Sequence, residues 1–227
     1  MLEATLIIGG AYLVGSIPSA FLLVRSMKGI DIRSYGSGTA GATNVMVHAG
    51  WWTGVSLGTF DSLVKGTLPV VVARLFDQSL GVQAAAGLVA VVGHNWSPFL
   101  RFTGGRGVAT ALGVVLGFPL WGEYLILTVV IGLIGRLLYK DTGFWTLVAL
   151  VALPVMTLIF DRPLEIVLTS VCIGLLLMAK RLIGNREPRT STYSMPLVLI
   201  YRLVWDRDVP RKARWTTRDP QESSIHD

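Results

Sequence analysis

Residues 144–160 read FWTLVALVALPVMTLIF, a continuous apolar run without a charged side chain. A helix that crosses the hydrocarbon core of a bilayer takes about 20 predominantly apolar residues, so this run is typical of a membrane span. Six further apolar stretches lie outward from it along the chain, at roughly 4–24, 52–75, 79–93, 107–120, 121–138 and 164–180. The sequence therefore predicts an all-α, polytopic transmembrane protein of about seven spans. Because 79–93 and 107–120 are short, five full spans are the alternative.

The composition supports a membrane protein. Of the 227 residues, 52% are hydrophobic and 15% are charged, whereas a soluble domain carries about a quarter charged residues. The net charge of +6 would also suit a nucleic-acid-binding protein. However, Lys and Arg gather in the connections between apolar stretches, as they do beside anionic lipid headgroups. We therefore expect a membrane partner and no nucleic acid.

The basic residues favour alternate connections, and this bias predicts the orientation. Those after the first, third, fifth and seventh stretches hold Arg25, Lys28, Arg33, Arg101, Arg106, Arg136, Lys140, Lys180 and Arg181. The other connections hold mainly acidic residues: Asp77, Glu123, Asp161 and Glu165. The positive-inside rule places the N-terminus outside and the C-terminus in the cytoplasm, which requires an odd number of spans.

The chain divides by composition into a transmembrane domain, 1–190, and a basic cytoplasmic tail, 191–227. We expect this tail to be solvated rather than to lie on the membrane surface. The single cysteine, Cys172, sits in the last apolar stretch, and we expect it to be buried and unreactive.

Two glycine-rich segments fall on the predicted cytoplasmic side. Residues 33–44 read RSYGSGTAGATN, and residues 93–110 read GHNWSPFLRFTGGRGVAT. Glycines let backbone N–H groups converge on an anion, and a helix that begins after Gly107 would add the positive end of its dipole. Arg106 would supply a bidentate positive charge for a phosphate. The alternative is that the glycines only allow close packing of helices.

Three titratable residues complete the candidates. Asp61 and Lys65 lie four residues apart within a predicted span, on one face of a helix, so we expect them to pair. Whether that pair is structural or takes part directly stays open. His94 is the best-placed group for proton transfer, although a lone histidine is more often structural. We find no spacing of metal ligands and no Ser/His/Asp arrangement.

These segments resemble the bacterial acyl-phosphate:glycerol-3-phosphate acyltransferases of the PlsY type. The resemblance also covers Gly15-Ser16-Ile17-Pro18-Ser19, Asp61-Ser62-Leu63-Val64-Lys65-Gly66, and Arg181-Leu182 with Glu187-Pro188, in order over residues 10–190. It implies transfer of a fatty acyl group from an acyl phosphate to the 1-hydroxyl of glycerol 3-phosphate, giving lysophosphatidic acid for phospholipid synthesis. It also implies a multi-pass protein of the bacterial cell membrane with a cytoplasmic active face, membrane lipid as a partner, and no cofactor.

The resemblance also assigns roles to residues. The implied catalytic residues are Ser37, His94 and Arg106. The implied substrate-binding residues are Gly36, Gly38, Thr39, Gly41, Thr43, Asn44, Gly104, Gly105, Gly107, Thr142, Lys180, Arg181 and Glu187. No metal site is implied.

Several positions differ from the family pattern. Thr39 stands in place of an Asn, Val47 in place of an Arg, and Arg106 in place of a Lys; Leu175 and Met178 lie near the places of a His and an Asn. These differences keep a second hypothesis open, a divergent and non-catalytic anion-binding or regulatory protein. A third hypothesis, an anion transporter, would call for internal repeats and binding groups near the bilayer midplane. Neither is evident.

Overall fold

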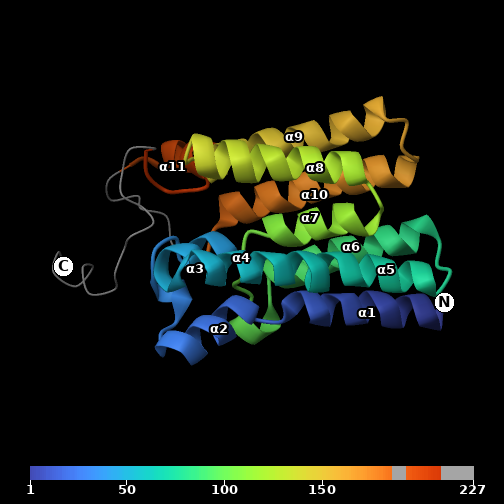
Figure 1. The fold of residues 1–227 in the computed structure, drawn as a ribbon, viewed down its shortest axis with the longest axis horizontal. Helices are drawn as coiled ribbons and strands as arrows, with labels where there is room; N and C mark the ends of the chain where they lie inside the picture. The colour runs from blue at the N-terminus through green and yellow to red at the C-terminus, as the bar shows by residue number, and fades with distance from the viewer. Residues whose placement is uncertain (186–192, 211–227) are drawn as a thin grey trace.

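The computed structural model describes residues 1–185 and 193–210, and its helices lie side by side in a bundle (Figure 1). The main rods of the bundle are α1 (Leu2–Ser16) with α2 (Ser19–Lys28), α4 (Trp51–Phe60) with η2 (Asp61–Thr67) and α5 (Leu68–Leu75), α6 (Leu80–Asn95), α7 (Val108–Gly117), α8 (Trp121–Thr128) with η4 (Val129–Leu138), α9 (Thr142–Ile159) and α10 (Leu164–Ile183). Each rod corresponds to one of the predicted apolar stretches.

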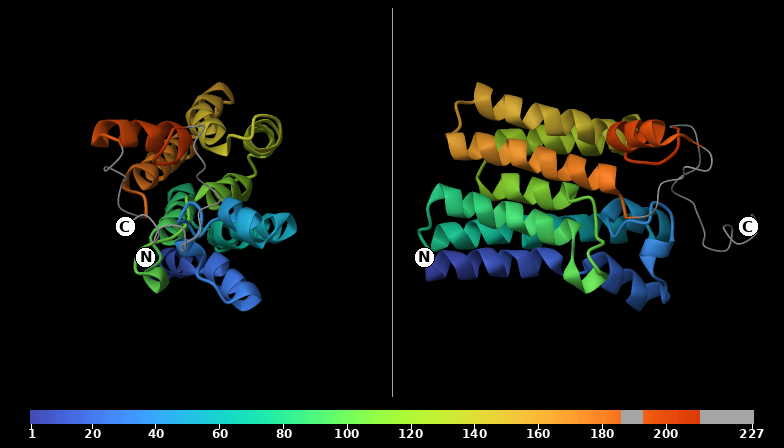
Figure 2. Two further views of the ribbon diagram at one scale, coloured as in Figure 1. Left: turned by 90° about the vertical axis from the view of Figure 1, so that its left-hand side faces the viewer. Right: turned by 180° about the vertical axis from the view of Figure 1, so that it is seen from behind.

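Shorter helices gather at one end of the bundle, opposite the N-terminus (Figure 1). They are α3 (Ala42–Ala49) and α11 (Met195–Trp205), with the single turns η1 (Ile32–Ser34) and η3 (Pro98–Leu100) in the nearby connections. The right-hand view of Figure 2 shows the same arrangement from behind, with α11 at the end of the bundle away from the N-terminus.

The all-α, multi-pass membrane fold is confirmed. Within the described residues, five helical segments are long and apolar enough to cross a bilayer: Leu2–Lys28, Trp51–Leu75, Trp121–Leu138, Thr142–Ile159 and Leu164–Ile183. The two predicted short stretches form α6 and α7, which lie within the bundle (Figure 2). The number of complete crossings and the orientation of the termini stay predictions.

Helix packing depends on close approach of backbones. Gly66 on η2 faces the backbone of Thr110 and Gly113 on α7, and Gly113 in turn faces the carbonyl of Ser62. A methyl group on either glycine would collide with backbone atoms that cannot move aside. Contacts of this kind suit membrane helices, which associate through packing of small residues rather than through the hydrophobic effect.

The rod formed by α4, η2 and α5 is locally widened at η2, which carries Asp61 and Lys65. Residues Asp61–Thr67 form a π-helical turn between α4 and α5. Lys65 Nζ lies 2.8 Å from Asp61 Oδ1, so the predicted pairing is confirmed. Ser19, at the start of α2, joins both: its hydroxyl donates to Asp61 Oδ1 at 2.8 Å and accepts from Lys65 Nζ at 2.7 Å. These charges are satisfied by one another inside the bundle, as burial at membrane depth requires.

Two expectations about the C-terminal third are wrong. Helix α11 packs against α9 and α10, with Val198 and Arg202 buried, so residues 195–205 are not a solvated tail. Cys172 is exposed on α10, because the core side of that helix presents Ile173 and Leu177 instead. The proposed domain division after residue 190 stays a prediction, and residues 211–227 lie outside the described part of the chain.

Candidate active site

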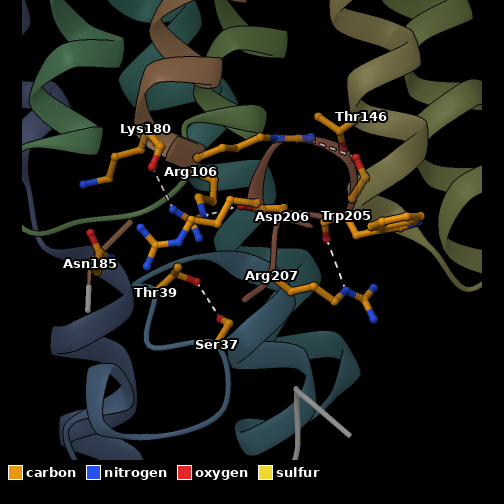
Figure 3. Close-up of polar contacts among 12 residues, drawn as sticks. Ser37, Thr39, Arg106, Thr146, Lys180, Asn185, Trp205, Asp206 and Arg207 are labelled. Atoms are coloured by element: carbon orange, nitrogen blue, oxygen red, sulfur yellow. Dashed lines mark hydrogen bonds and ion pairs between the residues drawn. The ribbon is translucent and has the colours of Figure 1, made fainter. Parts of the chain in front are cut away.

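A cavity of about 310 Å³ opens at the end of the bundle that carries α3 and α11. Its walls come from distant parts of the sequence: the first glycine-rich segment, the start of α7, the junction of η4 with α9, the end of α10, and the residues just after α11. Figure 3 shows how side chains from these elements converge.

A buried amide holds the first glycine-rich loop. The side chain of Asn44 is 3% exposed, and its Nδ2 donates to the carbonyls of Ile32, Tyr35 and Thr39 at 3.0–3.1 Å. This bracing fixes the loop around the Ser37 and Thr39 side chains, whose hydroxyl oxygens are 2.8 Å apart. Both residues belong to the cavity lining. Asn44 also lines the cavity, but its donor atoms are engaged by the loop.

The second glycine-rich loop packs directly on the end of α6. A side chain on Gly105 would collide with the imidazole of His94, and one on Gly107 would collide with the amide of Asn95. Gly107 has a positive φ of 76°, which favours glycine, and α7 begins at the next residue. The predicted loop-to-helix arrangement is therefore present, with Arg106, Gly107 and the first residues of α7 facing the cavity.

Two polar side chains tie the loops to each other. Arg33 in the first segment donates to the carbonyl of Leu100 and to the hydroxyl of Thr103 in the second. Its guanidinium also pairs with Asp31 at 2.7 Å, and this hydrogen bond lowers the pKa of the Asp31 carboxyl. Asn185, just after α10, donates to the carbonyls of both Gly38 and Gly104, at 3.3 and 2.7 Å.

Arg106 is held from two sides. Its Nη1 donates to the backbone carbonyl of Lys180 at 2.9 Å, and its Nε lies 2.8 Å from Oδ1 of Asp206 (Figure 3). The carbonyl lies in the last turn of α10 and also accepts from the backbone N–H of Gly184 at 3.0 Å. These two contacts fix the direction of the Arg106 side chain, which is part of the cavity lining.

His94 lies where the cavity meets the buried charges. The imidazole is nearly buried, and its Nδ1 is 3.9 Å from Asp61 Oδ2, beyond hydrogen-bond distance. Both residues line the cavity. Because Asp61 already pairs with Lys65 and Ser19, His94 is placed against an ionic cluster rather than beside a free base.

The cavity is basic overall, which suits an anion. Its lining has five basic side chains, Arg106, Arg136, Lys140, Arg181 and Arg207, and two acidic ones, Asp61 and Asp206. In a concave site with low-dielectric walls, such an excess concentrates anions and holds them more strongly than it would in water.

A small apolar crevice, of about 20 Å³, adjoins the cavity inside the bundle. It is lined by Val108, Ala111, Leu112, Val115, Leu127, Ile131, Thr146, Ala149, Leu150, Leu153 and Ile173, from α7, α8, η4, α9 and α10. Four of these, Val108, Leu112, Ile131 and Thr146, also line the cavity. One end of the site is therefore cationic and the other hydrocarbon-like.

The predicted site residues fall into three groups. Ser37, Thr39, Gly41, Thr43, Asn44, His94, Arg106, Gly107, Thr142 and Arg181 line the cavity. Gly36, Gly38, Gly104, Gly105 and Lys180 lie outside its lining; the two pairs of glycines shape the loops, and the Lys180 ammonium lies over the Trp96 ring. Glu187 lies outside the described residues.

Several residues of the cavity lining were not predicted from the sequence as site residues. Arg136 and Lys140 were noted only as charges that set the orientation. Asp61 was a candidate through its pairing with Lys65, with a direct role left open. Trp205, Asp206 and Arg207 fell in the expected tail. The basic pattern of the odd connections could have drawn attention to Arg136 and Lys140. Nothing in the local sequence distinguishes Asp206.

Comparison with known proteins gives one consistent family. The sequence profile of the family "Glycerol-3-phosphate acyltransferase" matches residues 5–186. "Glycerol-3-phosphate acyltransferase 4" of Dehalococcoides mccartyi (strain CBDB1) is 34% identical, over 94% of this chain and 93% of its own length. A glycerol-3-phosphate acyltransferase of Thermus thermophilus is 42% identical over 74% of this chain and 82% of its own.

Two solved structures share the fold. Both are crystal structures of PlsY (YgiH), described as an integral membrane glycerol 3-phosphate acyltransferase. The glycerol 3-phosphate form matches with a TM-score of 0.71 at 29% identity, covering 85% of this chain and 99% of that one. The lysophosphatidic acid form matches with a TM-score of 0.70 at 30% identity, covering 79% and 88%.

Proposed function

The chain belongs to the glycerol-3-phosphate acyltransferase family, and we propose that it acylates the 1-hydroxyl of glycerol 3-phosphate with an acyl phosphate as the donor. A new ester bond forms between the acyl carbon and the glycerol oxygen, and the bond from the acyl carbon to the phosphate oxygen breaks. The hydroxyl proton leaves with the inorganic phosphate, and lysophosphatidic acid is the product. The observation that carries this proposal is a basic cavity that continues into an apolar crevice.

The charges of the cavity suit both phosphates of this reaction. Arg106 supplies a fixed guanidinium at the start of α7, and Ser37 and Thr39 supply hydroxyls across the cavity. An acyl phosphate is already activated, so positioning and stabilisation of the leaving phosphate can provide much of the rate. No covalent intermediate on the protein is required. In this proposal Ser37 and Arg106 contact substrate, and His94 supports the Gly105 loop while facing the cavity.

We place the fatty chain along the apolar crevice, whose walls would have to move apart around it because its volume is about 20 Å³. Its walls at Ala111, Ala149 and Leu153 are apolar and lie deeper in the bundle than the glycine-rich loops. A chain held there would leave its phosphate end beside Arg106, because Val108 and Leu112 belong to both cavity and crevice. Each buried CH₂ stabilises binding by about 0.8 kcal/mol, so such a slot would discriminate among chain lengths.

We also propose that the cavity faces the cytoplasm of a bacterial cell. The end with the cavity carries the connections rich in Arg and Lys, and the opposite end carries Asp77, Glu123 and Asp161. The positive-inside rule supports this orientation. It would give the site access to a water-soluble acceptor from one side of the membrane.

The test is acyl transfer by purified protein in detergent or lipid mesophase, with palmitoyl phosphate and radiolabelled glycerol 3-phosphate. Labelled lysophosphatidic acid from the wild-type chain, and its loss in Arg106→Ala, is the expected result. Parallel reactions with palmitoyl-CoA test the donor: product from the thioester but not from the acyl phosphate would contradict the donor and leave the acceptor standing. Absence of product with either donor would contradict the proposed reaction.

A second candidate function is an anion-binding protein of the same fold without turnover. The ion pair between Arg106 and Asp206 favours it, because the protein's own carboxylate lies at the cation expected to bind phosphate. Binding of inorganic phosphate to folded protein that makes no product would support this candidate.

A further inference from the structure

The cavity is completed by residues that lie beyond the segment matched by the family profile. The family profile ends at residue 186, yet Trp205, Asp206 and Arg207 belong to the cavity lining. These three residues form the end of α11 and the positions directly after it. A segment that follows the profile match therefore contributes directly to the candidate active site (Figure 3).

Two buried arginines hold this segment in place. Arg202 on α11 donates to the carbonyls of Leu182 and Ile183, in the last turn of α10, and its Nε pairs with Asp208 at 2.6 Å. Arg181 on α10 makes the reciprocal contact, donating to the carbonyl of Leu203 at 2.8 Å. Helix C-termini leave carbonyls without partners inside the helix, so these arginines join α10 and α11 through backbone groups that would otherwise stay unsatisfied.

Asp206 ends α11 in a conformation that directs it at Arg106. It adopts the left-handed region, with φ 55° and ψ 40°, where Asp and Asn are tolerated better than most residues. Its Oδ1 lies 2.8 Å from Arg106 Nε, and the two side chains are 22% and 14% exposed. The contact is close but not aligned as a hydrogen bond: neither of these atoms has a hydrogen-bond partner among the described residues.

We propose that Asp206 is an affinity-determining residue, an internal anion that competes with the substrate phosphate for Arg106. This inference rests on the proposed function for the identity of the substrate. A phosphate carries more negative charge than a carboxylate and offers more acceptor oxygens, so it can make the aligned, bidentate contact that Asp206 does not make. Binding of substrate breaks the ion pair, and the cost of breaking it weakens the observed affinity.

Competition and simple positioning give opposite results when the charge of Asp206 is removed. If the carboxylate only orients Arg106, Asp206→Asn disturbs the guanidinium and binding weakens. If it competes, the same change leaves Arg106 without its internal partner and binding strengthens. Asn keeps the size of the side chain and also tolerates the left-handed conformation, so the variant isolates the charge.

The experiment measures binding of inorganic phosphate to the full chain in detergent, from the rise in thermal stability on titration at constant ionic strength. We expect Asp206→Asn to lower the apparent Kd by about two- to fivefold, the range for breaking a partly exposed ion pair. Asp208→Asn is the matched control, because Asp208 pairs with Arg202 in the same segment and does not touch Arg106. Adding Arg106→Ala to Asp206→Asn should abolish the gain.

Every other result of the phosphate titration overturns the proposal. Unchanged, weaker or undetectable phosphate binding in Asp206→Asn excludes competition, and an equal gain in Asp208→Asn assigns the effect to a loosened segment. Acyl transfer is assayed separately, and the KM for glycerol 3-phosphate should fall with the phosphate Kd. Tighter phosphate binding without turnover would contradict the proposed function and leave the role of Asp206 intact. Wild-type turnover together with unchanged phosphate binding in Asp206→Asn would support the proposed function and contradict the role of Asp206.

Discussion

Two of the ion pairs that border the cavity differ in burial, in sequence separation and in hydrogen bonding. Asp61 and Lys65 are almost fully buried, share the hydroxyl of Ser19, and lie one turn apart on the same rod. Arg106 and Asp206 are partly exposed, join segments 100 residues apart, and meet without hydrogen-bond alignment. The first pair is buried and shares a hydrogen-bonded serine, so it suits a structural role. The second can exchange one anion for another.

The largest expected effect comes from breaking the buried pair. Lys65→Met leaves Asp61 as an uncompensated charge inside the bundle, which we expect to cost about 3 to 5 kcal/mol of stability. Thermal unfolding in detergent and the yield of monodisperse protein measure the loss. The double variant Asp61→Asn/Lys65→Met should recover much of it, since neither buried charge remains. A single variant as stable as wild type would remove the structural role assigned to the pair.

The next effect concerns the exchangeable pair. Arg106→Ala should lower turnover by about 10²-fold or more, because a fixed charge beside the leaving phosphate is lost, while thermal stability changes little. Arg106→Lys keeps the charge, and we expect it to retain most of the activity. Steady-state rates with palmitoyl phosphate and glycerol 3-phosphate provide the measurement. Wild-type kinetics in Arg106→Ala would exclude this residue from the site.

A smaller effect is expected in the first glycine-rich loop. Ser37→Ala removes a hydroxyl that faces the cavity, and we expect kcat/KM to fall about tenfold, as for loss of one hydrogen bond to a charged group. Thr39→Val is the matched comparison, because Thr39 is the hydroxyl partner of Ser37 within the loop. Full activity in Ser37→Ala would show that the hydroxyl does not contact substrate.

The smallest effect is on chain length. Ala149 is buried and lines the apolar crevice, so Ala149→Leu should narrow the proposed slot. We expect the preferred acyl phosphate to become shorter, with a change of a few fold in the ratio of rates for lauroyl and palmitoyl phosphate. Ala152→Leu, on the same helix and outside the crevice lining, is the control. An unchanged ratio would place the acyl chain elsewhere.

The fold was largely predictable because a membrane helix can be identified from a local run of apolar residues. Runs such as 144–160 and 164–180 correspond to α9 and α10 within a few residues, since a bilayer demands apolar length regardless of tertiary context. The pairing of Asp61 with Lys65 followed from their spacing in the same way. Ser19, which completes that cluster, could not be inferred, because it is 42 residues away in sequence.

The candidate site was predictable only where it depends on short motifs. Arg106 and Gly107 face the cavity as the loop-to-helix pattern predicted. Gly104 and Gly105 belong to the same motif, but they pack on the end of α6. A side chain at either position would collide with His94 or Asn95. Asp206 was hidden in a stretch that composition assigned to a tail. Its position depends on how Arg181 and Arg202 dock α11, which no local pattern encodes.

The crevice between α7, η4 and α9 has a kinetic consequence for the proposed reaction. If the fatty donor reaches the crevice from the bilayer and the acceptor enters the basic cavity from water, the two reactants come from different phases. The donor concentration is then that in the lipid, and the acceptor concentration is that in the water. The rate would then follow the mole fraction of donor in the surrounding lipid or detergent, not its amount per litre. Diluting the donor with inert amphiphile would slow the enzyme at constant total donor, whereas the dependence on glycerol 3-phosphate would remain that of an ordinary solute.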